Sequence, residues 1–489
     1  MYKNYFWQND NIEYSNDRYW RPAIAYPEYR YPESGLSENN DIYDAIRNIF
    51  IELGLDSANI GTAGWNPLGE YISPGQTVLI KPNLVKDSNE ACEGKRGIEC
   101  LVTHPSIIRC IVDYVLIALK GEGRIIVADA PVQGCIFPNL REKIRLDDLE
   151  HFYRDNGEKI VVEDLRTVSM IKKDGVNVTI QNDLKYKGVE VNLAEDSFFF
   201  NNKNEGRVRI TNYDYHELNR HHTGNVQQYL ISEACLMADV VVNLCKPKSH
   251  RKAGFTGALK NMIGVNTSKE YLPHHTKGSK ESGRGDEYYT NEKMAAIRST
   301  FAEWQDIANK KEKYTFSKML YFTYKVINKL GRKYDKEKYR EGSWWGNDTI
   351  WRTIIDVNKA VIYADNNGKM CKEPQRRMIC FGDMIWCGEK EGPLLPSPKK
   401  VGGILFSDNA VVFDHILTKL MGFKQDKLVL LGNVSAEEKL YSGNIKEEIA
   451  NSNQERFCGR IDEIESNFAF RASDGWTGVI DCYQSEYKQ

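Results

Sequence analysis

Short apolar runs alternate with amphipathic stretches along the first half of the chain. Four runs rich in Val, Ile and Leu have the length of strands that are buried on both faces of a sheet, and they lie at 77–85, 123–131, 158–165 and 240–248. Apolar residues at helical spacing predict helices at 41–53, 104–119 and 226–239. Strands that alternate with helices in this way favour an α/β fold with a mainly parallel sheet.

The pattern returns in the second half, where a strand is predicted at 376–387 and a strand–turn–helix unit at 402–423, with a proline-bearing loop at 391–400 between them. These units predict a second α/β lobe and a cleft between the two lobes. The expected division is an irregular N-terminal arm at 1–40, a first lobe at 41–291, a helical insertion at 292–345, a second lobe at 346–432 and a C-terminal tail at 433–489.

The helical insertion is strongly basic. Between residues 310 and 340, eleven Lys and Arg residues stand against three acids. A stripe of apolar residues forms one predicted face, and four lysines lie largely off it: Phe316, Leu320, Ile327 and Leu330 make the stripe, and the lysines are Lys318, Lys325, Lys329 and Lys336. Segment 312–338 is therefore interpreted as a covering helix with a solvated face, a lid over an acidic substrate, or a peripheral contact with an anionic membrane. Of the two functional interpretations we favour the lid, because Thr323 interrupts the stripe.

Composition narrows the class of protein. The net charge of −2 gives no overall attraction to nucleic acid, so any basic function must be local. No apolar run reaches the roughly 18–20 residues that span a bilayer, and residues 1–20 do not have the pattern of a signal peptide. Eleven scattered cysteines favour reduced thiols, and no Cys-x-x-Cys motif predicts an iron–sulfur cluster. We expect a soluble, cytoplasmic protein.

Polar residues stand where each predicted strand of the first lobe ends. They are Lys81 and Asn83, Asp129, Asp164, and then Asn243, Lys246 and Lys248. In open α/β sheets, ligands bind beyond the carboxyl ends of the strands, so these residues predict a shared site. The alternative interpretation is that these residues are polar only because the loops at the strand ends are solvated.

The segment from Lys246 to Val265 has the richest chemistry in the chain. Its glycines allow a ligand to approach the backbone, and "GALKNMIG" is expected to begin a helix whose free N–H groups attract an anion. His250 can exchange a proton near neutral pH. A buried Lys260 or His250 would need a partner, and a bound anion is the simplest one. Downstream, either His274 or His275 can bind a metal ion from a loop.

Several of these blocks together resemble a known family. They are "TVLIKPNLV", "THPSIIRCIVDYV", "GRIIVADAP", "ADVVVNLCKPKSHRKAGFTGALKNMIGV" and "SDNAVVFDHILTKLMG", which are similar, in this order over residues 77–423, to domain-of-unknown-function family 362. More distantly, the spacing of His250, Ala253, Gly254, Thr256, Gly257, Ala258 and Lys260 resembles a block of the nickel-pincer lactate racemase family.

The second resemblance implies roles for individual residues. Lys260 would tether a nickel-pincer nucleotide, His250 would transfer protons, and His274 or His275 would bind the metal. The family's second proton-transfer histidine has no match here, and Asp129 and Gln133 occupy the corresponding loop. The candidate catalytic residues are therefore His250, Lys260 and Asp129. The candidate cofactor-binding residues are Lys81, Asn83, Lys246, Lys248, Gly254, Thr256, Gly257, Lys260 and Asn261.

These observations lead to one main hypothesis and two alternatives. The main hypothesis is an enzyme that binds an anionic small molecule or cofactor and transfers a proton or hydride, as a racemase, epimerase or oxidoreductase, on a hydroxy acid or sugar derivative. One alternative is a magnesium enzyme acting on a phosphorylated or nucleotide-linked substrate, with Asp129 and Asp383 at the metal. The other is a non-catalytic anion-binding module. Asp383, Asp408, Asp414 and His415 lie in the second lobe, where any of them could be a magnesium ligand or a base, but we expect them to be solvated loop residues.

Overall fold

A large mixed sheet forms the centre of the protein. The computed structural model describes residues 2–173, 176–283, 285–289, 291–331, 339–465 and 468–481. The eleven-stranded sheet has the main order β18-β17-β1-β16-β15-β11-β2-β3-β4, in which β18 (Gly459–Arg460) is the edge strand beside β17. Its parallel part confirms the predicted strands and consists of β2 (Thr77–Pro82), β3 (Arg124–Asp129), β4 (Val161–Asp164), β11 (Val240–Cys245) and β15 (Arg377–Glu391).

Helices cover both faces of this sheet. Since successive strand residues point to opposite faces, each strand packs against helices on both sides. Val78 and Ile80 of β2 belong to a buried cluster with α1 (Asp41–Glu52), α3 (Pro105–Leu119) and α5 (Leu146–Asp155). Leu79 belongs to the other cluster, with α11 (Ile350–Tyr363) and α12 (Ala410–Met421). The apolar runs of the sequence are thus explained by burial on both faces.

The predicted arrangement of two lobes is not confirmed. β15 pairs in parallel with β11, so a strand from 346–432 and a strand from 41–291 are neighbours in one sheet. β16 (Leu395–Ser407) then pairs with β15 in antiparallel orientation. The prediction of a loop at 391–400 is wrong, because the long hairpin of β15 and β16 includes Pro396 and Pro398 and leaves only a short turn at 392–394.

Two further local predictions differ from the structure. The N-terminal arm contains β1 (Asn4–Gln8), which pairs with β16 and with β17 (Ile449–Ser452) from the C-terminal tail. The helix predicted at 226–239 is strand β10 (Val226–Ser232) followed by the short helix α7 (Glu233–Leu236). In β10, buried and more exposed side chains alternate, and pairing with β7 (Gly188–Asn192) stabilises the strand over the helical alternative.

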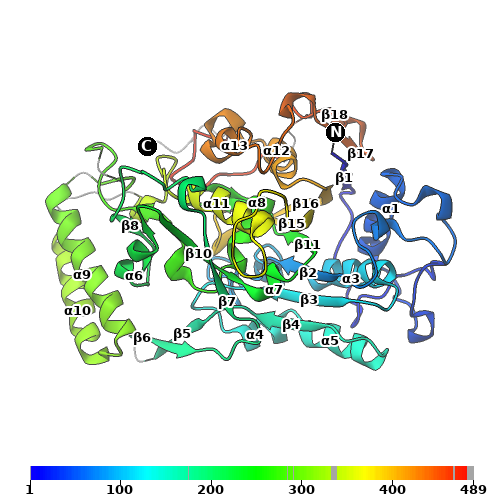
Figure 1. Ribbon diagram of the computed structural model, residues 1–489, viewed down its shortest axis with the longest axis horizontal. Helices are drawn as coiled ribbons and strands as arrows, with labels where there is room; N and C mark the ends of the chain where they lie inside the picture. The colour runs from blue at the N-terminus through cyan, green and yellow to red at the C-terminus, as the bar shows by residue number, and fades with distance from the viewer. Residues whose placement is uncertain are drawn as a thin grey trace.

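The basic insertion is a pair of helices at the edge of the molecule. α9 (Glu292–Lys310) and α10 (Tyr314–Gly331) lie side by side, on the side of the protein opposite α1 (Figure 1). Residues 332–338, including Lys336, lie outside the described residues. Within the part of the chain that the structure describes, no helix has both the length and the apolarity needed to cross a membrane.

The remaining elements frame the region beyond the carboxyl ends of the parallel strands. Two short strands, β12 (Lys248–His250) and β13 (Gly254–Thr256), form a hairpin, and β12 adds to the end of β15. A second hairpin is made by β5 (Val168–Lys173) and β6 (Val176–Gln181), and α9 and α10 both contact β6.

Candidate functional site

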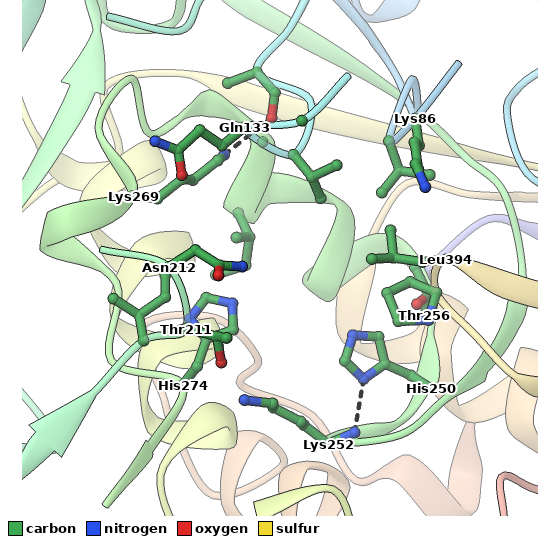
Figure 2. Close-up of a pocket in the computed structure, with 18 of the residues that line it drawn as sticks. Lys86, Gln133, Thr211, Asn212, His250, Lys252, Thr256, Lys269, His274 and Leu394 are labelled. Atoms are coloured by element: carbon green, nitrogen blue, oxygen red, sulfur yellow. Dashed lines mark hydrogen bonds between the residues drawn. The ribbon is translucent and has the colours of Figure 1, made fainter. Parts of the chain in front are cut away.

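A cavity of about 530 Å³ lies beyond the ends of β2 and β3 and beside the β12–β13 hairpin. Its wall carries six cationic side chains, namely Lys86, Lys248, Arg251, Lys252, Lys260 and Lys269. Among the described residues, only two carboxyl groups share the wall, those of Asp129 and Glu341. Figure 2 shows several of these side chains around the open space, among them Lys86, Lys252 and Lys269. The cavity is therefore suited to an anionic ligand.

The Lys81–Asp129 ion pair forms the base of this site. The two charged atoms are 2.7 Å apart, and both side chains are buried. Lys81 also donates to the carbonyl of Pro82, and Asp129 accepts the backbone N–H of Leu84. Burial lowers the pKa of Lys81, and the Asp129 carboxylate opposes that shift. Asp129, predicted as a catalytic residue, lines the cavity, whereas Lys81, predicted to bind the cofactor, lies behind it and holds Asp129 in place.

The glycine-rich block follows a different path from the one predicted. Its helix α8 covers only Ala258–Asn261 and continues as a 3-10 turn over Met262–Val265. The N–H groups of Ala258 and Leu259 donate to the carboxyl group of Asp414, at 2.6 and 3.2 Å. The prediction of a free, anion-binding helix N-terminus is therefore wrong, since a buried side chain from α12 occupies it.

The sequence predicts a solvated position for Asp414, and this prediction is wrong. Asp414 is fully buried, and burial raises its pKa to about 8. Its two hydrogen bonds fix the start of α8 and hence the direction in which Lys260 and Asn261 leave the backbone. No local signal could reveal this role, because Asp414 is 156 residues from Ala258 in the sequence.

The glycines of this block serve protein packing rather than ligand approach. A Cβ atom at Gly254 would lie 2.8 Å from Leu428, and one at Gly257 would lie 2.0 Å from Asp414. Neither glycine lines the cavity, so the structure does not place these two predicted ligand contacts at the site. Gly264 does line it, and a Cβ atom there would lie 2.1 Å from the Asp129 carboxylate.

We expect Gly264→Ala to destabilise the protein by about 1–3 kcal/mol, because the added methyl group would overlap the Lys81–Asp129 pair. Chemical denaturation followed by tryptophan fluorescence measures the change. Gly432→Ala is the matched control, since a Cβ atom at that position would have no neighbour within 4 Å. Equal stability of the two variants would contradict the close contact between Gly264 and Asp129.

Four lysines of the wall, Lys248, Lys252, Lys260 and Lys269, have a lowered pKa, and burial is the main cause in each case. The pKa falls to about 7 for Lys248 and Lys269 and to about 8 for Lys260. Lys248 donates to Asn83 and to the carbonyl of Leu101, and Lys269 donates to the carbonyl of Ala130. Among the described residues, the Lys260 ammonium has neither a hydrogen-bond acceptor nor a carboxylate partner, so its charge is uncompensated.

His250 and His274 line the same cavity and have opposite proton arrangements. Nδ1 of His250 accepts the backbone N–H groups of Lys252 and Ala253, at 3.0 and 3.1 Å, so the neutral ring carries its proton on Nε2. Nδ1 of His274 lies 2.7 Å from the carbonyl of Leu272 and must donate to it, which leaves a lone pair on Nε2. Burial lowers the pKa of both rings well below 6.5, and the nearby Lys260 adds to this effect.

These proton arrangements assign different capacities to the two rings. His250 presents a hydrogen-bond donor at Nε2, which suits an oxygen that becomes negatively charged. His274 presents an acceptor at Nε2, which suits a proton acceptor or a metal ligand whose other nitrogen is held by a backbone carbonyl. Figure 2 shows the two rings on the wall of the open space, with Lys252 beside them.

Among the described residues of the wall, two buried oxygen atoms have neither a hydrogen-bond partner nor an ion-pair partner. They are Oγ1 of Thr256 and Oε1 of Gln133, in side chains that are 3% and 7% exposed. Buried polar atoms are normally paired, so a ligand is the natural partner of both. Sequence reasoning found Thr256 and Asn261, but it did not find Lys269, which follows the glycine-rich block and has the lowered pKa described above.

Other predicted residues lie away from the cavity. Lys246 is fully buried, with Asp383 at 2.9 Å and the hydroxyl group of Tyr14 at 2.7 Å, beneath the N-terminal segment. Asp383 also accepts the N–H of His104, so its predicted solvated position is wrong. His275 lies 3.4 Å from Lys252 and 3.7 Å from Glu287 and does not line the cavity.

The arrangement of carboxylates and histidines bears on the predicted metals. Across the described ranges, no three His, Cys, Asp or Glu side chains are grouped so that they could hold a metal ion. Asp129 and Asp383, the residues of the magnesium alternative, are each paired with a different lysine. His274 is the predicted metal ligand that remains on the cavity wall.

The fold and the site together define an α/β protein with a cationic cavity at the carboxyl ends of a parallel sheet. Comparison with known families identifies its kind: residues 165–419, more than half of the chain, match the family described as "Domain of unknown function (DUF362)", and the protein belongs to this family. The match excludes β2 and β3, which sequence reasoning included in the resemblance. No curated protein and no solved structure matches this chain.

Proposed function

We propose that the protein is an enzyme that binds an anionic small molecule and moves a proton to or from one of its carbon atoms. The observation that carries the proposal is the unpaired Lys260 ammonium beside two histidines, one with an Nε2 donor and the other with an Nε2 acceptor. A hydroxy acid or a sugar derivative with a carboxylate or phosphate group has the required charge. We also propose a cytoplasmic location, on the basis of the scattered cysteines.

Each group has a definite task in this proposal. The substrate's anionic group is bound by lysines of the wall, with Thr256 and Gln133 completing its hydrogen bonds. Nε2 of His274 removes the proton from a carbon next to a carbonyl or carboxylate group. The electron pair of the broken C–H bond moves onto the neighbouring oxygen, where Lys260 and the Nε2–H of His250 stabilise the negative charge. The intermediate then turns over in the cavity, and His274 returns the proton to the opposite face of the carbon, which completes an epimerisation.

The cofactor implied by the resemblance to nickel-pincer racemases is compatible with three of the residues assigned to it. Lys260, the implied tether, and His274, an implied ligand, line one cavity with His250. A lysine of lowered pKa is also more often unprotonated, as covalent attachment requires. When bound, such a cofactor would accept a hydride from the substrate carbon. In either case His250 and Lys260 would stabilise charge on the substrate oxygen.

Hydrogen exchange tests the proposal directly. A panel of hydroxy acids and sugar phosphates is incubated with the protein in D₂O, and NMR records replacement of the carbon-bound hydrogen. We expect exchange for at least one compound, and His274→Gln should slow it by about 10²–10⁴-fold because the proton acceptor is lost. Phosphate binding should persist in that variant, since the lysines remain.

His216→Gln is the matched control, because this histidine lies outside the cavity. It should exchange hydrogen at the wild-type rate. Binding of anions without exchange of any compound would contradict the enzyme and favour an anion-binding module. If the His274→Gln variant exchanges hydrogen at the wild-type rate, His274 is not the proton acceptor.

A further inference from the structure

The outer face of helix α10 is apolar and basic but covered by nothing in the described structure. Six large apolar side chains on this helix are exposed; Tyr321 lies apart from the others, and the remaining five form a stripe, namely Phe316, Met319, Phe322, Val326 and Leu330. Phe322 is 70% exposed, Leu330 66% and Met319 56%. Spacings of three and four residues place all five on one side of the helix. Isolated exposed apolar residues are ordinary, but a stripe of this length on one helix is not.

The opposite side of α10 shows why this face is left outside. Ser317, Leu320 and Gly331 are buried, and Gly331 lets α10 approach α9 so closely that a Cβ atom there would lie 2.8 Å from Met294. The apolar stripe predicted from the sequence is therefore divided. Leu320 packs inward, whereas Phe316 and Leu330 belong to the exposed face. The expected packing of this stripe onto the body of the protein, as in a lid, is not formed.

The charges on α10 indicate what this face fits. Lys318, Lys325 and Lys329 are exposed and follow one another along the helix next to the apolar stripe. Helix α10 contains no acidic residue. On the neighbouring helix α9, Ile297 and Trp304 are exposed and lie two turns apart on one side. An exposed apolar stripe with tryptophan nearby and a row of lysines is typical of helices that lie in the surface of an anionic membrane.

We propose that the α9–α10 hairpin binds the surface of an anionic lipid membrane, with the apolar stripe of α10 inserted among the acyl chains and its lysines at the headgroups. The position of the hairpin at the edge of the molecule leaves this face accessible (Figure 1). The hairpin also contacts β6, whose Asn177 lines the cavity. Membrane binding would therefore act on an element that is packed against the cavity wall.

Vesicle co-sedimentation of the full chain tests this proposal. We expect the protein to pellet with vesicles of phosphatidylcholine and phosphatidylglycerol, but not with phosphatidylcholine alone, and to be released by high salt. Substitution of Lys318, Lys325 and Lys329 by Glu should lower the partition coefficient by at least about 100-fold, because each lysine near an anionic surface contributes about 1 kcal/mol. Phe322→Ser with Leu330→Ser should weaken binding at unchanged charge.

The matched control substitutes Glu for Lys203, Lys372 and Lys424, which are exposed elsewhere and change the net charge equally. It should pellet like the wild type. Melting temperatures of all variants should agree with that of the wild type, since every substituted side chain is exposed. The proposal is overturned if the wild type stays in the supernatant with anionic vesicles or if the control loses binding as strongly. A second result would also overturn it. In this case the wild type does not bind lipid, light scattering shows that it is a dimer, and the double variant Phe322→Ser, Leu330→Ser is a monomer.

Discussion

Replacement of Lys260 by methionine is expected to stabilise the protein in the absence of an anion and to abolish its stabilisation by phosphate. The ammonium group of Lys260 is uncompensated among the described residues, its side chain is only partly exposed, and the neighbouring charges of Lys252 and Lys81 repel it, so removal of this charge should add on the order of 1 kcal/mol to the free energy of unfolding. Methionine has a similar length and no charge. In the wild type, phosphate at 100 times its Kd should add about 2.7 kcal/mol to the free energy of unfolding.

The difference in the free energy of unfolding between Lys260→Met and the wild type should decrease as the pH rises. The pKa of Lys260 is lowered to about 8, whereas an unperturbed lysine has a pKa of about 10.4. Between these values the unfolded chain binds more protons at this position than the folded chain, so the contribution of Lys260 to stability rises with pH. The advantage of Lys260→Met should thus be largest below pH 8 and should diminish toward pH 10.

Thermal and chemical denaturation, with and without phosphate, measure both effects. Lys203→Met is the matched control, because Lys203 is exposed and away from the cavity, and it should respond to phosphate like the wild type. If Lys260→Met keeps the full response to phosphate, the anion site lies elsewhere and the proposed role of Lys260 is wrong.

Loss of either partner of the Lys81–Asp129 pair should destabilise the protein strongly. We expect Lys81→Met and Asp129→Asn each to lower the free energy of unfolding by about 3–5 kcal/mol, because each leaves a buried charge without its partner. The double variant should lose clearly less than the sum of the single effects, since no unpaired charge remains. Denaturation in urea, followed by tryptophan fluorescence, measures the four proteins of this cycle.

The exposed pair Lys3–Glu70 provides the control, with its charged atoms 2.6 Å apart. Lys3→Met should change stability by no more than about 1 kcal/mol, because solvent screens an exposed pair. Additive effects in the Lys81–Asp129 cycle would show that the two residues do not act as a pair. The position of Asp129 on the cavity wall would then need another explanation.

The sequence by itself predicted the elements whose signal is local. The strands at 77–85, 123–131 and 240–248 are continuous apolar runs because helices cover both faces of the sheet, and this burial is visible in composition alone. The convergence of strand ends was also predictable, since parallel strands place their carboxyl ends at one edge. Asn83, Asp129 and Lys248 accordingly meet at one cavity.

Where local signals competed, the tertiary structure decided. The apolar residues of β10 fit both the helical and the strand period over a short stretch, so the sequence predicts a helix, and only pairing with β7 selects the strand. In the same way, β1 has no strong signal of its own and is formed by pairing with β16, about 400 residues away. Register between distant strands depends on partners that a single segment does not encode.

The division of the lysines between structure and site was likewise decided by tertiary contacts. Lys246 and Lys248 are two residues apart, yet Lys246 is paired with Asp383 and Tyr14, whereas Lys248 faces the cavity. Gly257 was predicted to approach a ligand but makes room for Asp414. A sequence shows which residues can bear charge, but whether a buried charge meets a carboxylate or an open cavity depends on residues brought together by folding. That difference separates a structural ion pair from a binding site.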